Sequence, residues 1–138
     1  MKRSPLRRNL PPKRPAYHKA WLVGRNYCWN CGWRPGLWSN VWPRRLETHE
    51  MVRGPNRWKA FPDPRCWIRT CNLCHEEEFA TMPIAKQLAI KKLVDPEHYS
   101  RIAVNLLRVR DEEAVSKNQV DAEIKKLERA GFRPKEGE

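Results

Sequence analysis

Two CxxC pairs constrain this chain of 138 residues more than any other feature: Cys28 with Cys31, and Cys71 with Cys74. Gly32 follows the first pair, and glycine permits the positive φ that a tight metal-binding turn needs. Four thiolates satisfy the tetrahedral coordination of zinc and leave no position open for a substrate. The spacing therefore predicts one structural zinc that ties the front of the chain to its middle and compensates for a small core.

Two alternative roles for the cysteines have less support. A redox dithiol needs one CxxC on a thioredoxin-like βαβ frame, and no such frame is visible in the sequence. Ordinary buried cysteines would not need this spacing, and reduced intracellular thiols favour metal binding over disulfides. The fifth cysteine, Cys66, is predicted to be a small buried hydrophobic side chain.

The positive charge of the chain is confined to its first half. Residues 1–75 hold 16 Lys and Arg against 3 Asp and Glu, whereas residues 76–138 hold 12 against 13. Clustered cations gain affinity for nucleic acid by releasing counterions from its phosphate backbone. We therefore expect the first half to bind nucleic acid. A basic surface that only keeps the protein in solution is the alternative.

The sequence also carries an expectation about membranes. No segment approaches the roughly 18 apolar residues of a membrane span. Prolines interrupt the basic N-terminus where a signal peptide would need an apolar run. We therefore expect no membrane partner.

All seven tryptophans lie between residues 21 and 67. Bulky aromatic side chains around a small zinc site can replace a larger core, and we expect this role for most of them. Base stacking by one exposed member, such as Trp58, is the alternative.

The pattern of prolines, cysteines and apolar residues divides the chain into four segments. They are a flexible, basic, proline-rich arm over 1–20, a zinc-bound core over 21–82, a helical extension over 83–131 and a loose tail over 132–138. The arm cannot bury enough apolar surface to fold alone. It is either a plain disordered terminus or a segment that grips phosphates.

Within the core, residues 46–52 and 66–70 are predicted to be extended. The proline-rich residues 53–65 between them are predicted to form a basic loop. A first helix is predicted from His75 to about residue 81, where the approach to a proline ends it.

The extension is predicted to hold three helices, over residues 83–94, from an Asp-Pro cap to about 108, and over about 117–130. The last has Ser116 as its N-cap and Gly131 as its stop. The apolar face of the middle helix would consist of Ile102, Ala103, Leu106 and Leu107.

In chain order, the motifs of the core are CxxCG, LETHEMVRG and CNLCHEE. This order resembles the HNH (ββα-metal) endonuclease family in its zinc-containing form, of the bacterial and phage type. The resemblance covers about residues 28–80. It implies an α+β fold with a small zinc-stabilised ββα-metal core, in which two antiparallel strands and a helix hold one divalent ion. It also implies action in the cytoplasm of a bacterial or phage-infected cell.

The resemblance assigns roles to individual residues. His75, directly after the second CxxC, takes the place of the helix ligand of the catalytic ion, and His49 takes that of the strand ligand. Glu50 then stands where the family has its general-base histidine. If the strand is shifted by one residue, His49 becomes the base and Thr48 the ligand, which is chemically poor. Cys66 stands where the family has the asparagine that shapes its loop.

The chemistry of these side chains is consistent with such a site. A divalent ion such as Mg²⁺, Mn²⁺ or Ni²⁺ held by His49 and His75 would polarise a scissile phosphate, while Glu50 or His49 activates water. Each histidine also has a plainer possible role, His49 as a partly buried strand residue and His75 as a side chain packed against the zinc knuckle. The glutamates at 76–78 are expected to favour a helix N-terminus rather than bind metal. The backbone phosphates would be neutralised by Arg53, Arg57, Lys59, Arg65 and Arg69.

The predicted function is metal-dependent hydrolysis of DNA phosphodiester bonds, with RNA a less favoured substrate. The principal alternative is a zinc-containing nucleic-acid-binding module that kept the scaffold and lost catalysis. A third class is an adaptor that works through its C-terminal helices, which are amphipathic and nearly neutral. These helices would pack on the core or form a homodimer rather than bind DNA.

Overall fold

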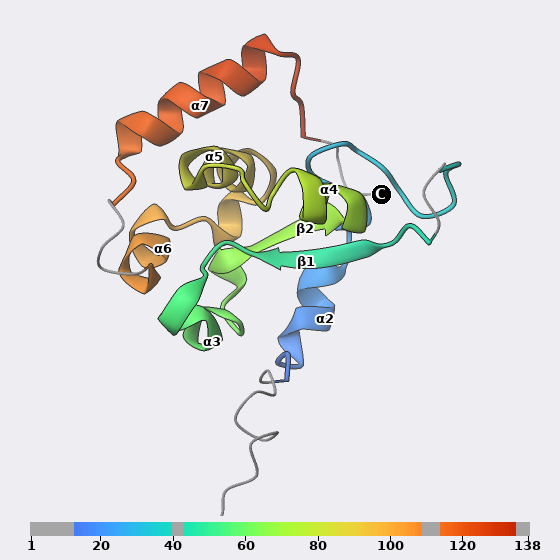
Figure 1. The fold of residues 1–138 in the computed structure, drawn as a ribbon, viewed down its shortest axis with the longest axis horizontal. Helices are drawn as coiled ribbons and strands as arrows, with labels where there is room; N and C mark the ends of the chain where they lie inside the picture. The colour runs from blue at the N-terminus through green and yellow to red at the C-terminus, as the bar shows by residue number, and fades with distance from the viewer. Residues whose placement is uncertain (1–12, 40–42, 109–113, 135–138) are drawn as a thin grey trace, which may run out of the picture.

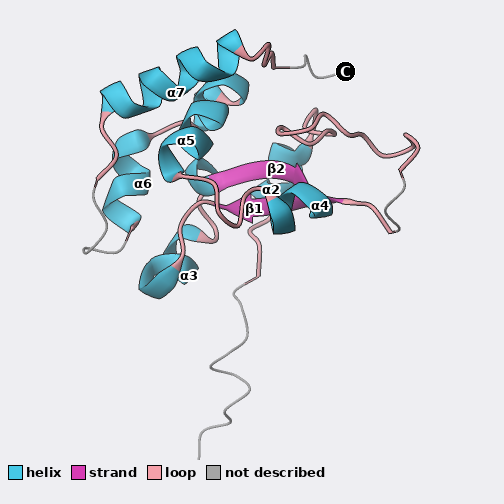
Figure 2. Ribbon diagram, turned by 45° about the horizontal axis from the view of Figure 1, so that its top comes forward, coloured by secondary structure: helices cyan, strands magenta, loops and turns pink. Residues whose placement is uncertain are grey.

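A sheet of two antiparallel strands lies at the centre of the molecule, with helices packed around it (Figure 1 and Figure 2). The computed structural model describes residues 13–39, 43–108 and 114–134. The helices and strands are α2 (Tyr17–Leu22), β1 (Leu46–Glu50), α3 (Arg57–Ala60), β2 (Trp67–Cys71), α4 (Asn72–Glu77), α5 (Ile84–Val94), α6 (Arg101–Leu107) and α7 (Lys117–Arg129). This is the small α+β architecture expected from the sequence.

The two strands confirm the extended segments expected at 46–52 and 66–70, except that β1 ends at Glu50 and Cys66 belongs to the turn before β2. They pair in antiparallel register from Leu46 opposite Cys71 to Glu50 opposite Trp67. A two-stranded sheet is marginally stable alone in water. The helices that cover it are therefore part of what holds it together.

Alternate side chains of β1 point to opposite faces of the sheet. Thr48 faces α2, where its hydroxyl lies 3.0 Å from Nε2 of His18. His49 faces α4 and α5, and its ring packs against the ring of Phe79, with 5.0 Å between centroids. The pleat therefore decides which side chains of the LETHE strand can meet His75 of α4.

The segment between the strands is not the plain loop expected over 53–65. It forms a 3-10 turn at Gly54–Asn56, the short helix α3, and a second 3-10 turn at Pro64–Cys66. Pro55 and Pro64 stand in the first turn of these elements, where the N–H that proline lacks has no hydrogen-bond partner to lose. The prolines therefore start short helices instead of preventing them.

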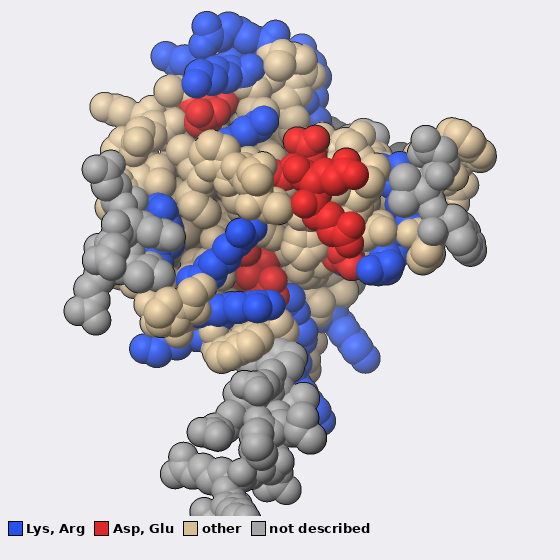
Figure 3. Space-filling model, in the orientation of Figure 1, with Lys and Arg blue, Asp and Glu red and all other residues tan. Residues whose placement is uncertain are grey.

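Helix α4 follows β2 directly, beginning at Asn72 rather than at His75. The sulfur of Cys71 accepts the backbone N–H of Cys74 and caps the helix. Because α4 begins three residues earlier than expected, the glutamates at 76–78 lie beyond its first turn. The expectation that they are stabilised by the positive end of the helix dipole is therefore wrong. They are exposed, and Figure 3 shows acidic side chains gathered on the surface over α4.

The N-terminal segment is folded where the structure describes it. The ring centroids of Tyr17, His18 and Trp21 in α2 lie 6.0, 4.8 and 5.2 Å from the centroid of Trp67 in β2. The flexible arm expected over 1–20 is therefore wrong for residues 13–20, whereas residues 1–12 lie outside the described part of the chain. Aromatic packing against a distant strand outweighs the local composition here.

The C-terminal extension contains the three expected helices, with one corrected boundary. Helix α7 carries a capping box in which Ser116 and Gln119 bond each other's backbone, and Gly131 follows with φ of 87°. Helix α6 begins only after Ser100, its N-cap. The Asp-Pro pair before it starts a separate 3-10 turn, Pro96–His98, and not the helix itself. Of the expected loose tail, residues 135–138 lie outside the described part.

The buried face of α6 also differs from the expectation. Ala103 and Val104 are buried, whereas Ile102 and Leu106 are 64% and 77% exposed. The apolar residues of this short helix lie on more than one side of it, and the side that carries Val104 packs against the core. Leu107 is partly buried, as expected.

Aromatic residues form much of the core, as the tryptophan distribution predicts. Trp21, Trp29, Trp33 and Trp67 are buried, and the expected burial of Cys66 is confirmed. Trp58 is 40% and Trp38 86% exposed, and Trp42 lies outside the described residues. Within the described ranges, none of the helices is long and apolar enough to cross a bilayer.

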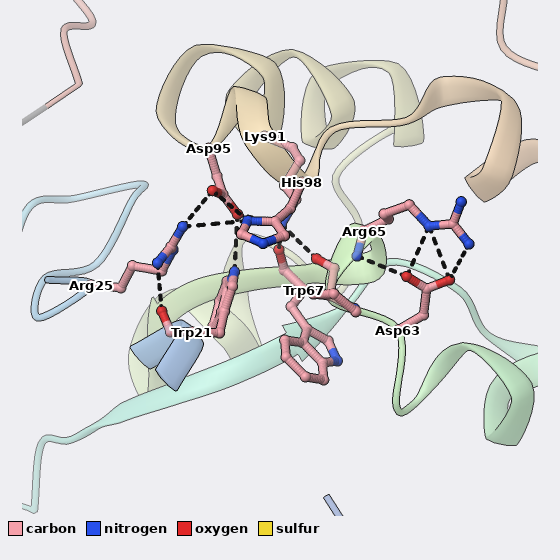
Figure 4. A network of polar contacts seen from close by, with 9 residues as sticks. Trp21, Arg25, Asp63, Arg65, Trp67, Lys91, Asp95 and His98 are labelled. Carbon is pink, nitrogen blue, oxygen red and sulfur yellow. Dashed lines mark hydrogen bonds and ion pairs between the residues drawn. The ribbon is translucent and has the colours of Figure 1, made fainter. Parts of the chain in front are cut away.

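A buried polar network joins α2, β2 and α5 (Figure 4). The fully buried Lys91 amine donates to the carbonyls of Pro64 and Trp67 at 2.8 and 2.7 Å, and to Asp95 at 2.8 Å. Asp95 also accepts hydrogen bonds from Trp21 and Arg25 at 3.0 and 2.5 Å. Although burial raises the pKa of Asp95, Lys91 and its other partners outweigh this and hold it well below its usual value. Lys91 and Asp95 therefore face each other as a fully hydrogen-bonded ion pair.

Candidate metal centre and adjoining pocket

The four cysteines of the two CxxC pairs converge as predicted. Their sulfur atoms, from Cys28, Cys31, Cys71 and Cys74, all lie within 4.8 Å of one another. Across the described ranges, this is the sole group of three or more potential ligand side chains placed to hold a metal ion. The cluster can therefore bind a metal, and a set of four sulfur ligands is compatible with structural zinc.

Backbone hydrogen bonds reach the first sulfur of each pair, and such bonds favour the anionic form of that sulfur. Cys31 and Cys74 donate their backbone N–H groups to the first sulfur of each pair, at 3.5 and 3.4 Å. Gly32 has φ of 80°, the conformation that the turn was expected to require. The guanidinium of Arg44 lies 3.3 Å from the sulfur of Cys31, an electrostatic partner that the CxxC spacing does not reveal. The hydrogen bond between the Cys74 thiol and Cys28 lowers the pKa of Cys28 and raises that of Cys74.

His49 and His75 meet on one face of the sheet. Their ring centroids lie 5.1 Å apart, His49 on β1 and His75 on the helix that the cysteine cluster begins. Both line a pocket of about 260 Å³, whose other walls come from Glu50, Val52, Arg53, Gly54 and Arg57. The structure therefore brings together the two histidines that the motif order singled out.

His49 is held by a helix outside the strand pair. Only 3% of the residue is exposed, and its Nε2 lies 2.8 Å from Oε1 of Gln87 in α5. Burial lowers the pKa of His49 to about 4, so the ring is neutral at pH 7. A neutral imidazole is the form that binds a metal or accepts a proton.

His75 is held by a second partner from β1. Its Nδ1 lies 3.0 Å from Oε1 of Glu47. Sequence reasoning missed both Glu47 and Gln87. Residues 47 and 49 lie on the same face of a strand because side chains alternate. This alternation could have predicted that Glu47 lies beside the histidine pair. No sequence pattern could have predicted Gln87, because it reaches the site from α5, far along the chain.

Glu50, the expected general base, lines the pocket and is already paired. Its Oε1 accepts a hydrogen bond of 2.5 Å from Arg14. The same guanidinium stacks 3.9 Å above the ring of Phe61 and donates to its carbonyl. Thr48, the ligand in the shifted strand register, contacts His18 on the face of the sheet away from His75.

The five expected phosphate-binding residues are divided between two places. Arg53 and Arg57 are exposed and line the pocket, and Lys59 is exposed on α3 nearby. Figure 3 shows basic side chains lying across this surface between α3 and β1. Arg65 pairs with Asp63 at 2.8 Å. Arg69 is half-buried on the α2 face of the sheet, donates to the carbonyl of Arg25, and has its pKa lowered by burial.

Comparisons of this chain with protein-family models, with curated proteins and with solved structures give no match. What the protein does is therefore inferred from three features described above: the cysteine cluster, the histidine pair and the arginines beside it.

Proposed function

We propose that this chain is a metal-dependent endonuclease that hydrolyses DNA phosphodiester bonds on an HNH-like ββα core stabilised by zinc. The observation that carries the proposal is the histidine pair. His49 in β1 and His75 in α4 approach within 5.1 Å, centroid to centroid, inside a unit of two strands and the helix that follows them. Two exposed arginines, Arg53 and Arg57, line the same pocket.

Zinc is the metal we assign to the cysteine cluster. Four thiolates leave no ligand position for a substrate, so this site would be structural. It joins the turn at Cys28 to the start of α4, and α4 carries His75. The zinc would thereby fix the position of one pocket histidine relative to the sheet.

We assign a second divalent ion to the pocket. Two imidazoles supply two ligands, and water and substrate phosphate would supply the rest. Imidazole suits Ni²⁺ and Zn²⁺ better than Mg²⁺, which prefers oxygen ligands. Bound there, the ion would polarise the scissile phosphate and stabilise the leaving oxygen.

The protein side chains have distinct parts in the proposed reaction. Arg53 and Arg57 would hold the phosphates that flank the scissile bond. Glu50 is the proposed base, and its Oε1 is occupied by Arg14 before substrate binds. His49 is neutral at pH 7, and it could replace Glu50 only if it does not bind the ion, because a neutral imidazole has one unprotonated nitrogen.

One observation favours the non-catalytic alternative. The carboxylate of Glu50 is engaged by Arg14, so a water molecule would have to displace this hydrogen bond to reach the same oxygen. If it does not, the chain would bind DNA through the same arginines and never cut it.

Nicking of supercoiled plasmid separates the two functions. Zinc-loaded protein is assayed with Mn²⁺, Ni²⁺ or Mg²⁺, and His49→Ala and His75→Ala are compared with His98→Ala, which lies outside the pocket. Each variant is first checked for one bound zinc and unchanged circular dichroism. We expect nicking by wild type and His98→Ala and none by the pocket variants. Binding without nicking by the wild type would sink the nuclease proposal in favour of the binding module.

A further inference from the structure

We propose that Gln87 and Glu47 are positioning residues that fix opposite tautomers of the two pocket histidines. His49 is left with a free Nδ1 and His75 with a free Nε2, and these are the nitrogens that bind an ion or accept a proton. The use of these nitrogens rests on the proposed function. The tautomers themselves are a property of the protein before any substrate or second ion binds.

The orientation of the Gln87 side chain follows from its two hydrogen bonds. Its Nε2 lies 2.9 Å from the carbonyl of Met82, which can only accept. The amide nitrogen must therefore face Met82, and the amide oxygen must face His49. That oxygen lies 2.8 Å from Nε2 of His49 and can only accept, so Nε2 carries the hydrogen.

The second histidine is fixed by a carboxylate. Nδ1 of His75 lies 3.0 Å from Oε1 of Glu47, and an ionised carboxylate has no hydrogen to donate. Nδ1 of His75 therefore carries the hydrogen. Its Nε2 is then the nitrogen with a free lone pair when the ring is neutral.

Burial strengthens the constraint on the tautomer and orientation of His49. His49 and Gln87 are each 3% exposed, so water does not compete for their hydrogen bond. The ring of Phe79 packs against His49 at 5.0 Å between centroids and restricts its rotation. An imidazole held in one tautomer and one orientation has less freedom to lose on binding an ion.

Through Gln87, helix α5 positions the ring of His49. Gln87 belongs to the segment after residue 83, outside the strand–strand–helix unit, and α5 is the element that carries it. Glu47 and His49 share a face of β1 because they are two residues apart in a strand. The two histidines are therefore positioned by residues of β1 and α5, although α5 itself does not line the pocket.

The tautomers can be read directly by long-range ¹H–¹⁵N correlation spectra of the full chain labelled with ¹⁵N-histidine and loaded with zinc alone. We expect a protonated Nε2 and an unprotonated Nδ1 for His49, and the reverse for His75. A protonated Nδ1 on His49, or a mixture of its tautomers, would overturn the assignment.

Substitutions of Gln87 test whether it sets the tautomer. Gln87→Leu removes the acceptor, Gln87→Glu keeps it, and Lys86→Ala changes the neighbouring residue of the same helix. We expect Gln87→Leu to release His49 into mixed tautomers and to weaken Mn²⁺ binding by about 10- to 100-fold in calorimetry. Gln87→Glu and Lys86→Ala should keep the tautomer. A spectrum of Gln87→Leu like that of the wild type would contradict the role of Gln87.

The two proposals fail in different ways. If the spectra show the expected tautomers but Mn²⁺ neither binds nor supports nicking, the tautomer assignment stands and the nuclease function fails. If the plasmid is nicked but His49 carries its hydrogen on Nδ1, the nuclease function stands and this inference fails.

Discussion

At the scale of single residues, Glu50 occupies the most informative position in the pocket. A glutamate that activates water must be free to take a proton, and here its carboxylate is bonded to Arg14 of the N-terminal segment. The guanidinium of Arg14 is itself stacked on Phe61 and bonded to the carbonyl of that residue. The pair is therefore part of the packing between the N-terminal segment and the loop before β2, and substrate phosphate would have to compete for Arg14.

Replacement of Glu50 by glutamine tests its proposed role. The variant keeps the shape of the side chain and removes the proton acceptor. We expect the single-turnover nicking rate to fall by about 100-fold or more, because general bases typically contribute this much. DNA affinity, measured by fluorescence anisotropy, should not fall. Nicking at the wild-type rate would contradict the role of Glu50 as the base.

At the scale of elements, the Lys91 network ties α5 to the sheet and to α2. Lys91 sits inside the core with no exposed surface, and it joins β2 to Asp95 through three hydrogen bonds. Because α5 also carries Gln87, this anchor holds the helix whose side chain positions His49. The network and the pocket are therefore linked through one rigid helix.

Lys91→Met should destabilise the protein by about 3 kcal/mol, because removing one partner of a buried ion pair leaves the other uncompensated. Lys92→Met is the matched control, since Lys92 is partly exposed and its amine lies 3.6 Å from the carboxylate of Asp121. Its loss should cost less than about 1 kcal/mol, as for other surface pairs. Urea unfolding of the zinc-loaded proteins measures both changes. If Lys91→Met lowered the free energy of unfolding by no more than Lys92→Met, the buried network would add no stability.

Elements with local signals could be predicted from the sequence. The strand around His49 alternates toward two faces, and α7 has a capping serine, an apolar period and a terminal glycine in the expected places. The cysteine cluster followed from spacing alone. In each case the residues that specify the element lie within or beside it.

Elements that depend on distant contacts could not be predicted in this way. Helix α2 is held by aromatic contacts with Trp67, and the segment that precedes it is basic and rich in proline. The short helices between the strands begin at prolines that also fit a loop. Within the site, Gln87 and Arg14 come from outside the motifs that identify the histidines, so only the folded chain brings them in.

At the scale of the whole molecule, the cysteine cluster is the junction between the tryptophan-rich front and α4. The sheet has only two strands, and Trp29 and Trp33 pack beside the first cysteine pair. Acidic side chains cover the surface over α4, and basic ones lie between α3 and β1 (Figure 3). DNA approaching the histidine pair would therefore meet the arginine side and not the α4 surface.

Removal of the metal should unfold the region around the sheet. Structural zinc contributes an apparent 10–16 kcal/mol, roughly, in zinc-finger peptides, and whole domains are stable by only about 5–15 kcal/mol. We expect a strong chelator to abolish the near-ultraviolet circular dichroism of the buried tryptophans. Cys71→Ala should have the same effect, whereas Cys66→Ala should keep both metal and signal. An unchanged spectrum after chelation would show that the cluster is not a structural metal site.

The most direct test of a shared second ion is pulsed EPR of Mn²⁺ bound to the zinc-loaded chain, labelled with ¹⁵N-histidine and mixed with a short DNA duplex. If His49 and His75 hold the ion, the wild type will show couplings from two directly bound imidazole nitrogens. His49→Ala and His75→Ala will each show one. Bound Mn²⁺ with no histidine coupling, or with couplings unchanged in both variants, would contradict the proposal.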